Sequence, residues 1–294
     1  MTSPIESKAS DTSDSKCPVE GCSLPLDITL RASDGILFGA HQKNLECFSE
    51  AFPRKGWTTE KKDEVVDLSE PGAILSLLLR FMHNHPLPNL KQECKEWSVD
   101  DLLALIKASE KYGILVALQV TTKALKSKAK VMNDDDLLKV LLHKAIRSDA
   151  TDIEEFARRT LRISEKEVLM KFKSHTDVFW AWNCYRLEWQ AWKNKYWEAF
   201  QRKQYSNTHG TARYGWSDCA DFFAYFNNIE PLTRKFGDDF PTLEHFNQAE
   251  NILNALPGAK QCNSCDNFGR WRTNAKTAFS SQPRWVECMN QLTQ

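Results

Sequence analysis

The residues best suited to chemistry are the nine cysteines, because a thiolate can bind a metal or act as a nucleophile. Cys262 and Cys265 are separated by two residues, a spacing that places two thiolates on one turn, as in half of a tetrahedral zinc site. Cys17 and Cys22 form a second pair, in the stretch CPVEGC. Cys17 and Cys22 are interpreted as a zinc half-site or as ordinary free thiols. Cys262 and Cys265 are interpreted as structural thiols, as a zinc half-site or as a redox pair, and no second Cys-x2-Cys or His-x3-His accompanies them.

Recognised catalytic frames are absent from the sequence. Gly-x-Ser-x-Gly, His-Glu-x2-His and every Gly-x-Gly loop that could hold phosphate are missing. His41 has no Ser or Cys nucleophile in a recognisable frame. We therefore predict a protein that is not an enzyme and binds no cofactor, unless zinc binds at Cys262 and Cys265.

Aromatic residues form the most unusual stretch, because Trp182, Tyr185, Trp189, Trp192 and Tyr196 follow spacings of 3, 4, 3 and 4. These spacings place all five side chains on one face of a helix. The stripe is interpreted as part of a second core, as a surface that binds a partner protein, or as a platform for single-stranded nucleic acid. The neutral charge of the chain argues against the third interpretation.

Composition indicates a globular chain of about two domains, since 294 residues correspond to roughly 150 residues each. Lys plus Arg and Asp plus Glu both number 39, so the sequence lacks the basic field of a nucleic-acid-binding protein. No apolar run reaches the ~18 residues of a membrane helix, and no signal peptide is evident. These features predict a cytoplasmic or nuclear protein whose partners are proteins, not membranes or nucleic acid.

The elements that must position these residues begin after a polar tail, residues 1–25, which is expected to be disordered. Strands are predicted where apolar residues alternate before the Asp34-Gly35 turn, directly after that turn, and at 65–68. Helices follow at 42–52, 70–82, 99–112 and 115–126, with Ser69 and Ser98 as expected caps and Gly113 as a terminator. The pattern predicts an α+β domain with helices clustered beside a small sheet. The residues expected in its core are Leu45, Phe48, Phe52, Ile74, Leu78, Leu105 and Tyr112.

Several of these residues carry a resemblance to a known family. Asp27 before a strand, then Phe38, and then His41-x3-Leu45-x3-Ser49-x2-Phe52 resemble the opening of the BTB/POZ domain. The stretch from Ala108 through Lys111-Tyr112-Gly113 to Leu118 is similar to the family's fifth-helix region. The likeness is closest to fungal BTB proteins and covers residues 26–128.

The resemblance implies a BTB/POZ-like fold and a role in protein interaction. Family members self-associate and recruit other proteins; some link substrates to cullin-based ubiquitin ligases, and others act in transcriptional repression. We therefore expect a homo-oligomer and an adaptor or scaffold, with a cullin as one candidate partner. The alternative is a transcription regulator or zinc-dependent nucleic-acid-binding protein that uses the C-terminal cysteines.

The second half is predicted to be mostly helical. Residues 129–205 have the apolar periodicity of consecutive helices and correspond to the helical extension that often follows a BTB domain. Residues 206–294 form a terminal region that contains tryptophans and cysteines.

Overall fold

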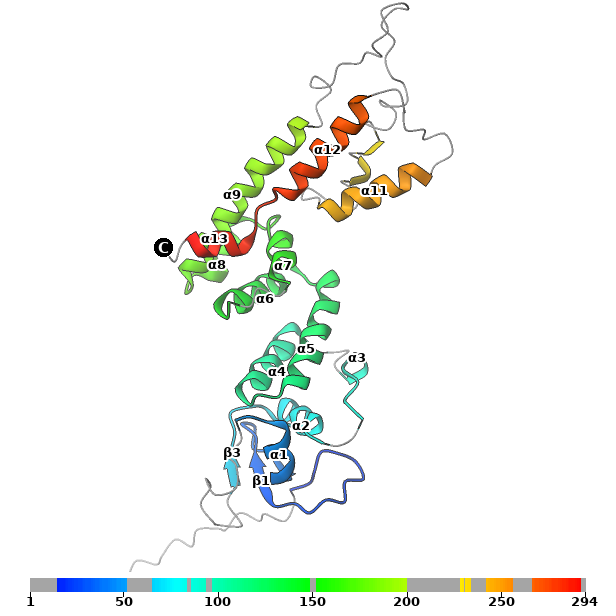
Figure 1. The fold of residues 1–294 in the computed structure, drawn as a ribbon. Helices are drawn as coiled ribbons and strands as arrows, with labels where there is room; N and C mark the ends of the chain where they lie inside the picture. The colour runs from blue at the N-terminus through cyan, green and yellow to red at the C-terminus, as the bar shows by residue number, and fades with distance from the viewer. Residues whose placement is uncertain are drawn as a thin grey trace, which may run out of the picture. The chain divides into compact units, whose positions relative to one another are not determined.

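The computed structural model describes residues 15–51, 65–83, 86–93, 97–148, 152–199, 228–229, 231–233, 242–255 and 266–291 (Figure 1). The chain divides into two compact units, Met1–Asp136 and Leu137–Gln294. The first unit is mixed α+β with a small sheet, as the sequence predicts, and it ends later than the expected boundary at residue 128. The described part of the second unit is helical.

A three-stranded sheet organises the first unit, in the order β2-β1-β3. Its strands are β1 (Ile28–Arg31), β2 (Leu37–Ala40) and β3 (Val65–Asp67). The β1–β2 pair is an antiparallel hairpin, as predicted, and Gly35 makes its turn with φ +84°. The β1–β3 pair is parallel, so β3 reaches the sheet only after the chain has crossed over through a helix. Leu30 of the central strand is fully buried.

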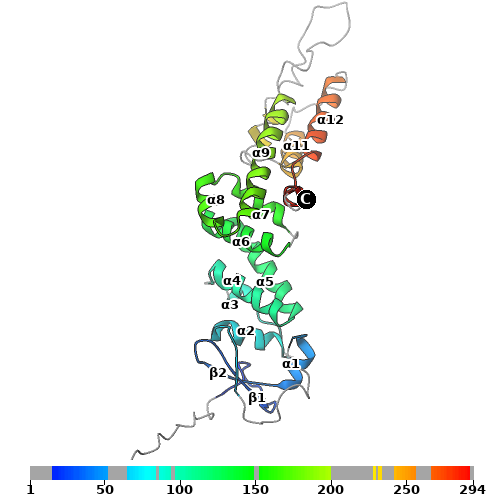
Figure 2. The same ribbon diagram turned by 90° about the vertical axis from the view of Figure 1, so that its left-hand side faces the viewer.

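Helices supply most of the first core. They are α1 (Gln42–Phe48), α2 (Gly72–Phe81), α3 (Leu90–Glu93), α4 (Val99–Lys111) and α5 (Leu115–Lys128), followed by the short 3-10 helix η1 (Ala129–Val131). Helix α2 lies between the sheet and the helices α4 and α5 (Figure 2). In both views α4 and α5 lie side by side. Ser98 caps α4 through a capping box with Asp101, as predicted, and Gly113 ends it with φ +66°.

Two sequence predictions about this unit are corrected. Ser69 does not cap α2; the helix begins after Pro71, and the N–H of Gly72 donates to the Asp34 carboxylate at 2.8 Å. The cap therefore comes from the hairpin turn, far away in sequence. Phe48 is not a core residue, because it lies at the end of α1 and is 38% exposed.

The described part of the second unit is built around one long helix. Its elements are α6 (Asp134–Ile146), α7 (Ile153–Thr160), α8 (Glu165–Phe172), α9 (Thr176–Ala199), α11 (Leu243–Ala255), α12 (Asp266–Ser280) and α13 (Trp285–Gln291). Helix α9 packs against α8, α12 and α13. Described residues of both predicted regions, 129–205 and 206–294, therefore contribute to one core.

Candidate functional sites

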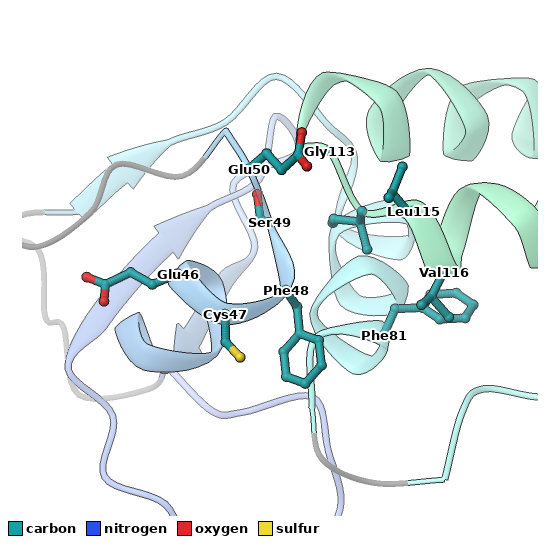
Figure 3. A pocket seen from close by; sticks show the side chains of 10 residues that line it. Glu46, Cys47, Phe48, Ser49, Glu50, Phe81, Gly113, Leu115 and Val116 are labelled. Carbon is teal, nitrogen blue, oxygen red and sulfur yellow. The ribbon is translucent and has the colours of Figure 1, made fainter.

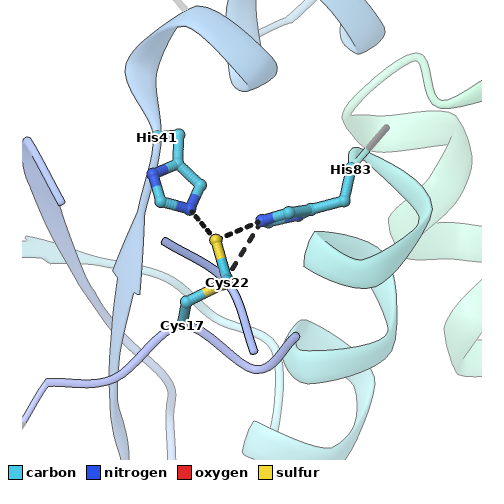
Figure 4. A group of neighbouring side chains, drawn as sticks. All are labelled: Cys17, Cys22, His41 and His83. Atoms are coloured by element: carbon cyan, nitrogen blue, oxygen red, sulfur yellow. Dashed lines mark hydrogen bonds between the residues drawn. The ribbon is translucent and has the colours of Figure 1, made fainter. Parts of the chain in front are cut away.

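Two cysteines and two histidines meet in the first unit (Figure 4). The Sγ of Cys17 lies 3.2 Å from Nε2 of His83, and the Sγ of Cys22 lies 3.3 Å from Nε2 of His41. A third distance, from Cys22 Sγ to His83 Nε2, is 3.7 Å. The four potential ligand atoms all lie within 4.8 Å of one another. We call these four residues the Cys/His cluster.

The cluster corrects the prediction of a disordered tail for the described residues 15–25. The carbonyl of Lys16 accepts a hydrogen bond from the Gly39 N–H at 3.0 Å, so the segment pairs with the edge of β2. Val19 is buried between the two cysteines in sequence. Its carbonyl accepts from the Cys22 N–H at 3.2 Å, which closes a turn that brings both thiols to one side.

Both imidazoles are held in place by backbone carbonyls. Nδ1 of His41 lies 2.8 Å from the oxygen of Pro25, and Nδ1 of His83 lies 2.9 Å from the oxygen of Leu79. A carbonyl only accepts, so each Nδ1 carries the proton and each Nε2 is left with a lone pair that faces the thiols. These backbone contacts anchor both histidines.

The surroundings of Cys17 shift the pKa of its thiol in both directions. Burial raises its pKa, and the neighbouring Cys22 raises it further, while the N–H of Val19 at 3.4 Å from its sulfur lowers it. The net pKa is raised. Two adjacent thiolates repel each other, so the pair is best stabilised by a cation between them.

A second feature is a pocket of about 550 Å³ between the end of α1 and the start of α5 (Figure 3). Phe48 stands on one side of it, and Leu115 and Val116 stand on the other. These three apolar side chains are 38%, 60% and 40% exposed, respectively. The pocket is lined by Glu46, Cys47, Phe48, Ser49, Glu50, Phe81, Gly113, Ile114, Leu115 and Val116. We call it the α1/α5 groove.

The predicted motif residues stabilise the frame of this groove. Asp27 accepts from the first N–H of α1, that of Gln42, at 2.6 Å. Leu45 is buried, as expected. Ser49 follows the last residue of α1, which ends at Phe48, before the predicted end at 52, and its hydroxyl donates to the carbonyl oxygen of Tyr112. The motif residues thus fix α1 at its start and join its end to the end of α4.

Lys111 and Tyr112 meet a buried carboxylate. The hydroxyl of Tyr112 donates to Glu70 at 2.5 Å, and Lys111 Nζ donates to it at 2.8 Å. Burial by itself raises the pKa of Glu70, but hydrogen bonds from Lys111, Tyr112 and Ser69 outweigh burial and hold that pKa below its ordinary value of 4.5. Burial and the contact with Glu70 raise the pKa of Tyr112 to about 12. At neutral pH the network therefore contains an ionised Glu70 and a neutral Tyr112.

We predict that Glu70→Gln lowers the free energy of unfolding by about 1.5–3 kcal/mol at pH 7, because charged hydrogen bonds are lost. The native pKa of Glu70 is depressed, so its contribution is present above pH 4.5 and is lost as the pH falls through that native pKa. The difference between wild type and variant should therefore shrink in acid. Urea unfolding at several pH values measures it, with the exposed Glu50→Gln as control. A difference that does not depend on pH would contradict the prediction.

In the second unit the aromatic stripe is core. Trp182, Tyr185, Trp189 and Trp192 are each at most 6% exposed. Trp182 Nε1 donates to Thr160 Oγ1 at 3.0 Å, and the ring of Tyr185 lies 5.7 Å from that of Trp285. The partner-binding assignment of these four residues is therefore corrected, because a partner cannot reach them in the folded unit. The side chain of Tyr196 lies outside the described residues.

A second group of possible ligands joins α9 to α13. Cys184 and Cys288 lie 3.8 Å and 3.5 Å from the two carboxylate oxygens of Glu188. Burial and the neighbouring Cys184 and Glu188 raise the pKa of Cys288 far above its ordinary value. Both sulfurs are placed to donate to this carboxylate. Among the described residues the group has three members, one short of a closed tetrahedral site.

The Cys/His cluster cannot be assembled from the sequence alone. Cys17 and Cys22 form one of two cysteine pairs, and no motif marks His83. The available signal was the Cys-x4-Cys spacing, which lies within the range of zinc ligand pairs. The other pair, Cys262 and Cys265, and the motif residue Phe52 lie outside the described residues.

Comparison with known proteins gives no further assignment. No protein-family model, curated protein or solved structure matches this chain. Among the described residues, no helix is both long and apolar enough to cross a membrane.

Proposed function

We propose that the chain is a non-enzymatic interaction protein whose first unit, a BTB/POZ-like domain, recruits a partner protein at the α1/α5 groove. The order of elements supports this proposal: an antiparallel hairpin, a helix, a parallel third strand and a group of helices. The residues that carry the BTB resemblance also support it, since Asp27, Ser49 and Tyr112 make structural contacts around the groove.

The single observation that carries the proposal is the exposed apolar surface of the groove. Phe48, Leu115 and Val116 come from two helices and border one cavity. Scattered exposed apolar residues are normal, but a contiguous set beside a cavity is typical of a binding surface. A partner that covered these side chains would remove their apolar area from water, which favours association.

Charge at the rim indicates the chemistry of the partner. Glu46 and Glu50 border the groove, and no Lys or Arg is among the described residues that line it. A two-fold contact between copies at this face would bring like charges together, which costs energy. We therefore propose a partner segment with a large apolar side chain flanked by Lys or Arg. The expected self-association would then use another surface of the chain. Recruitment of a cullin, as an adaptor, remains one form of the proposed function.

We predict that Phe48→Asp combined with Leu115→Asp weakens partner binding at least about tenfold, because two apolar contacts are replaced by charges. The probe is a random peptide library displayed on phage and selected against the wild-type chain. Selected peptides should combine an aromatic or Leu side chain with Lys or Arg, and their affinity is measured by fluorescence anisotropy.

The matched control is Val131→Asp, which adds a charge at a side chain that is 85% exposed on η1 and does not line the groove. It should leave peptide affinity unchanged. If the selected peptides bound the wild type, the double variant and Val131→Asp with equal affinity, the groove would not be the docking site. Light scattering of the full chain provides a second readout: a loss of oligomer mass only in the double variant would assign the groove to a second copy and overturn the proposed partner.

A further inference from the structure

We propose that Cys17, Cys22, His41 and His83 bind one zinc ion, which fastens the N-terminal segment to the first unit. Two thiols and two imidazoles form a Cys2His2 set, which is a ligand set of structural zinc sites. Softer thiolate and imidazole ligands favour zinc over Mg²⁺ or Ca²⁺, which prefer oxygen. The inference concerns a site separate from the α1/α5 groove.

The spacing of the ligand atoms fits a tetrahedral ion. Zinc bonds of 2.0–2.3 Å place neighbouring ligand atoms about 3.3–3.8 Å apart at the corners of a tetrahedron. Three of the four sulfur-to-nitrogen distances in the cluster are 3.2, 3.3 and 3.7 Å. All four ligand atoms lie within 4.8 Å of one another, so the longest separation exceeds the tetrahedral range by about 1 Å at most.

The orientation of the rings also fits a metal. Both Nε2 atoms point toward the sulfurs, and both Nδ1 atoms donate to backbone carbonyls (Figure 4). This arrangement is the usual outer shell of a zinc-bound histidine, because the second hydrogen bond fixes the tautomer and the ring angle. His41 and His83 are only 4% and 7% exposed, so their positions are set by the fold.

Four protein ligands leave no coordination position for water or substrate, so the predicted role of the ion is structural. The ligands come from three places: the N-terminal segment, His41 directly before α1, and His83 two residues after the end of α2. Within the described residues 15–25, Val19 is the one buried apolar side chain. The segment has little core of its own, and the ion supplies the anchor that burial does not.

The competing interpretation is a metal-free network in which each thiol donates a hydrogen bond to an imidazole. Metal content separates the two. The full chain is purified without a chelator or a histidine tag, and zinc is measured by inductively coupled plasma mass spectrometry. We expect about one zinc per chain in the wild type and none in Cys17→Ser combined with Cys22→Ser. Cys184→Ser combined with Cys288→Ser is the matched control and should keep the zinc.

A second measurement does not depend on whether a variant folds. The wild-type chain is stripped of metal and titrated with Co²⁺, which should give visible bands of tetrahedral cobalt and a near-ultraviolet thiolate band, saturating at about one equivalent. Limited proteolysis should cut residues 15–25 faster in the stripped protein than after zinc is restored. Failure of the stripped wild type to bind zinc or cobalt would overturn the proposal. A zinc content as high in the Cys17/Cys22 variant as in the wild type would also overturn it, and so would a disulfide between Cys17 and Cys22 in protein purified under reducing conditions.

Discussion

Replacing Trp182 with alanine is expected to lower the free energy of unfolding by about 3–5 kcal/mol, the usual cost of removing a buried tryptophan. The side chain is fully buried in the second core, and its indole N–H donates to Thr160. The change therefore leaves a large cavity and removes a donor from a buried hydroxyl. Denaturant unfolding followed by far-ultraviolet circular dichroism measures the loss.

Trp180 provides a matched control for this prediction. It lies two residues earlier on the same helix but is 56% exposed. Trp180→Ala should change the free energy of unfolding by no more than about 0.5 kcal/mol, as expected for a surface position. Similar losses in both variants would mean that the stripe does not form the core as described.

Replacing Gly113 with alanine is expected to cost about 2–5 kcal/mol, because two penalties combine. Its φ of +66° is a left-handed conformation that L residues adopt at a cost. In addition, a Cβ at this position would lie 2.9 Å from the Cβ of Glu50 and 3.1 Å from its backbone nitrogen. The helix end would have to move away from the end of α1.

The variant Gly35→Ala measures the conformational penalty without the steric one. Gly35 also has a positive φ, +84°, but a Cβ there would meet nothing within 4 Å. Gly35→Ala should therefore cost only about 1–2 kcal/mol, the conformational part alone. Thermal unfolding of the two variants compares them directly. An equal cost at both positions would show that the contact with Glu50 contributes nothing.

The sequence predicted the elements that depend on local pattern. The hairpin around Gly35, the capping box at Ser98 and the end of α4 at Gly113 each follow from residues close together in the chain. The same holds for the aromatic face of α9, whose spacing indicates one helix face and whose burial in a second core is one of the three interpretations of the sequence. Local turn and cap chemistry is decided by neighbours, so a single sequence is enough to identify it.

Features that depend on contacts between residues far apart in the chain could not be predicted from the sequence. Asp34 caps α2 in place of Ser69, and no local pattern indicates that a hairpin turn will reach that helix. Phe48 satisfied the helical spacing but lies in the last position of a short helix, where the core no longer covers it. His83 became part of a candidate site only because α2 ends beside the N-terminal segment. Such contacts depend on tertiary packing, which periodicity does not contain.

The strand order of the sheet has a consequence for the order of folding. The central strand β1 pairs with β2 across a tight turn, whereas its pairing with β3 joins Arg31 to Asp67, 36 residues apart. Closing the longer loop costs more chain entropy, and contacts between distant residues form more slowly. The hairpin therefore forms first, within about 1–10 μs for a typical isolated hairpin, and β3 joins it later. Because Asp34 of the hairpin turn caps α2, the turn is already formed when that helix arrives to cover the sheet.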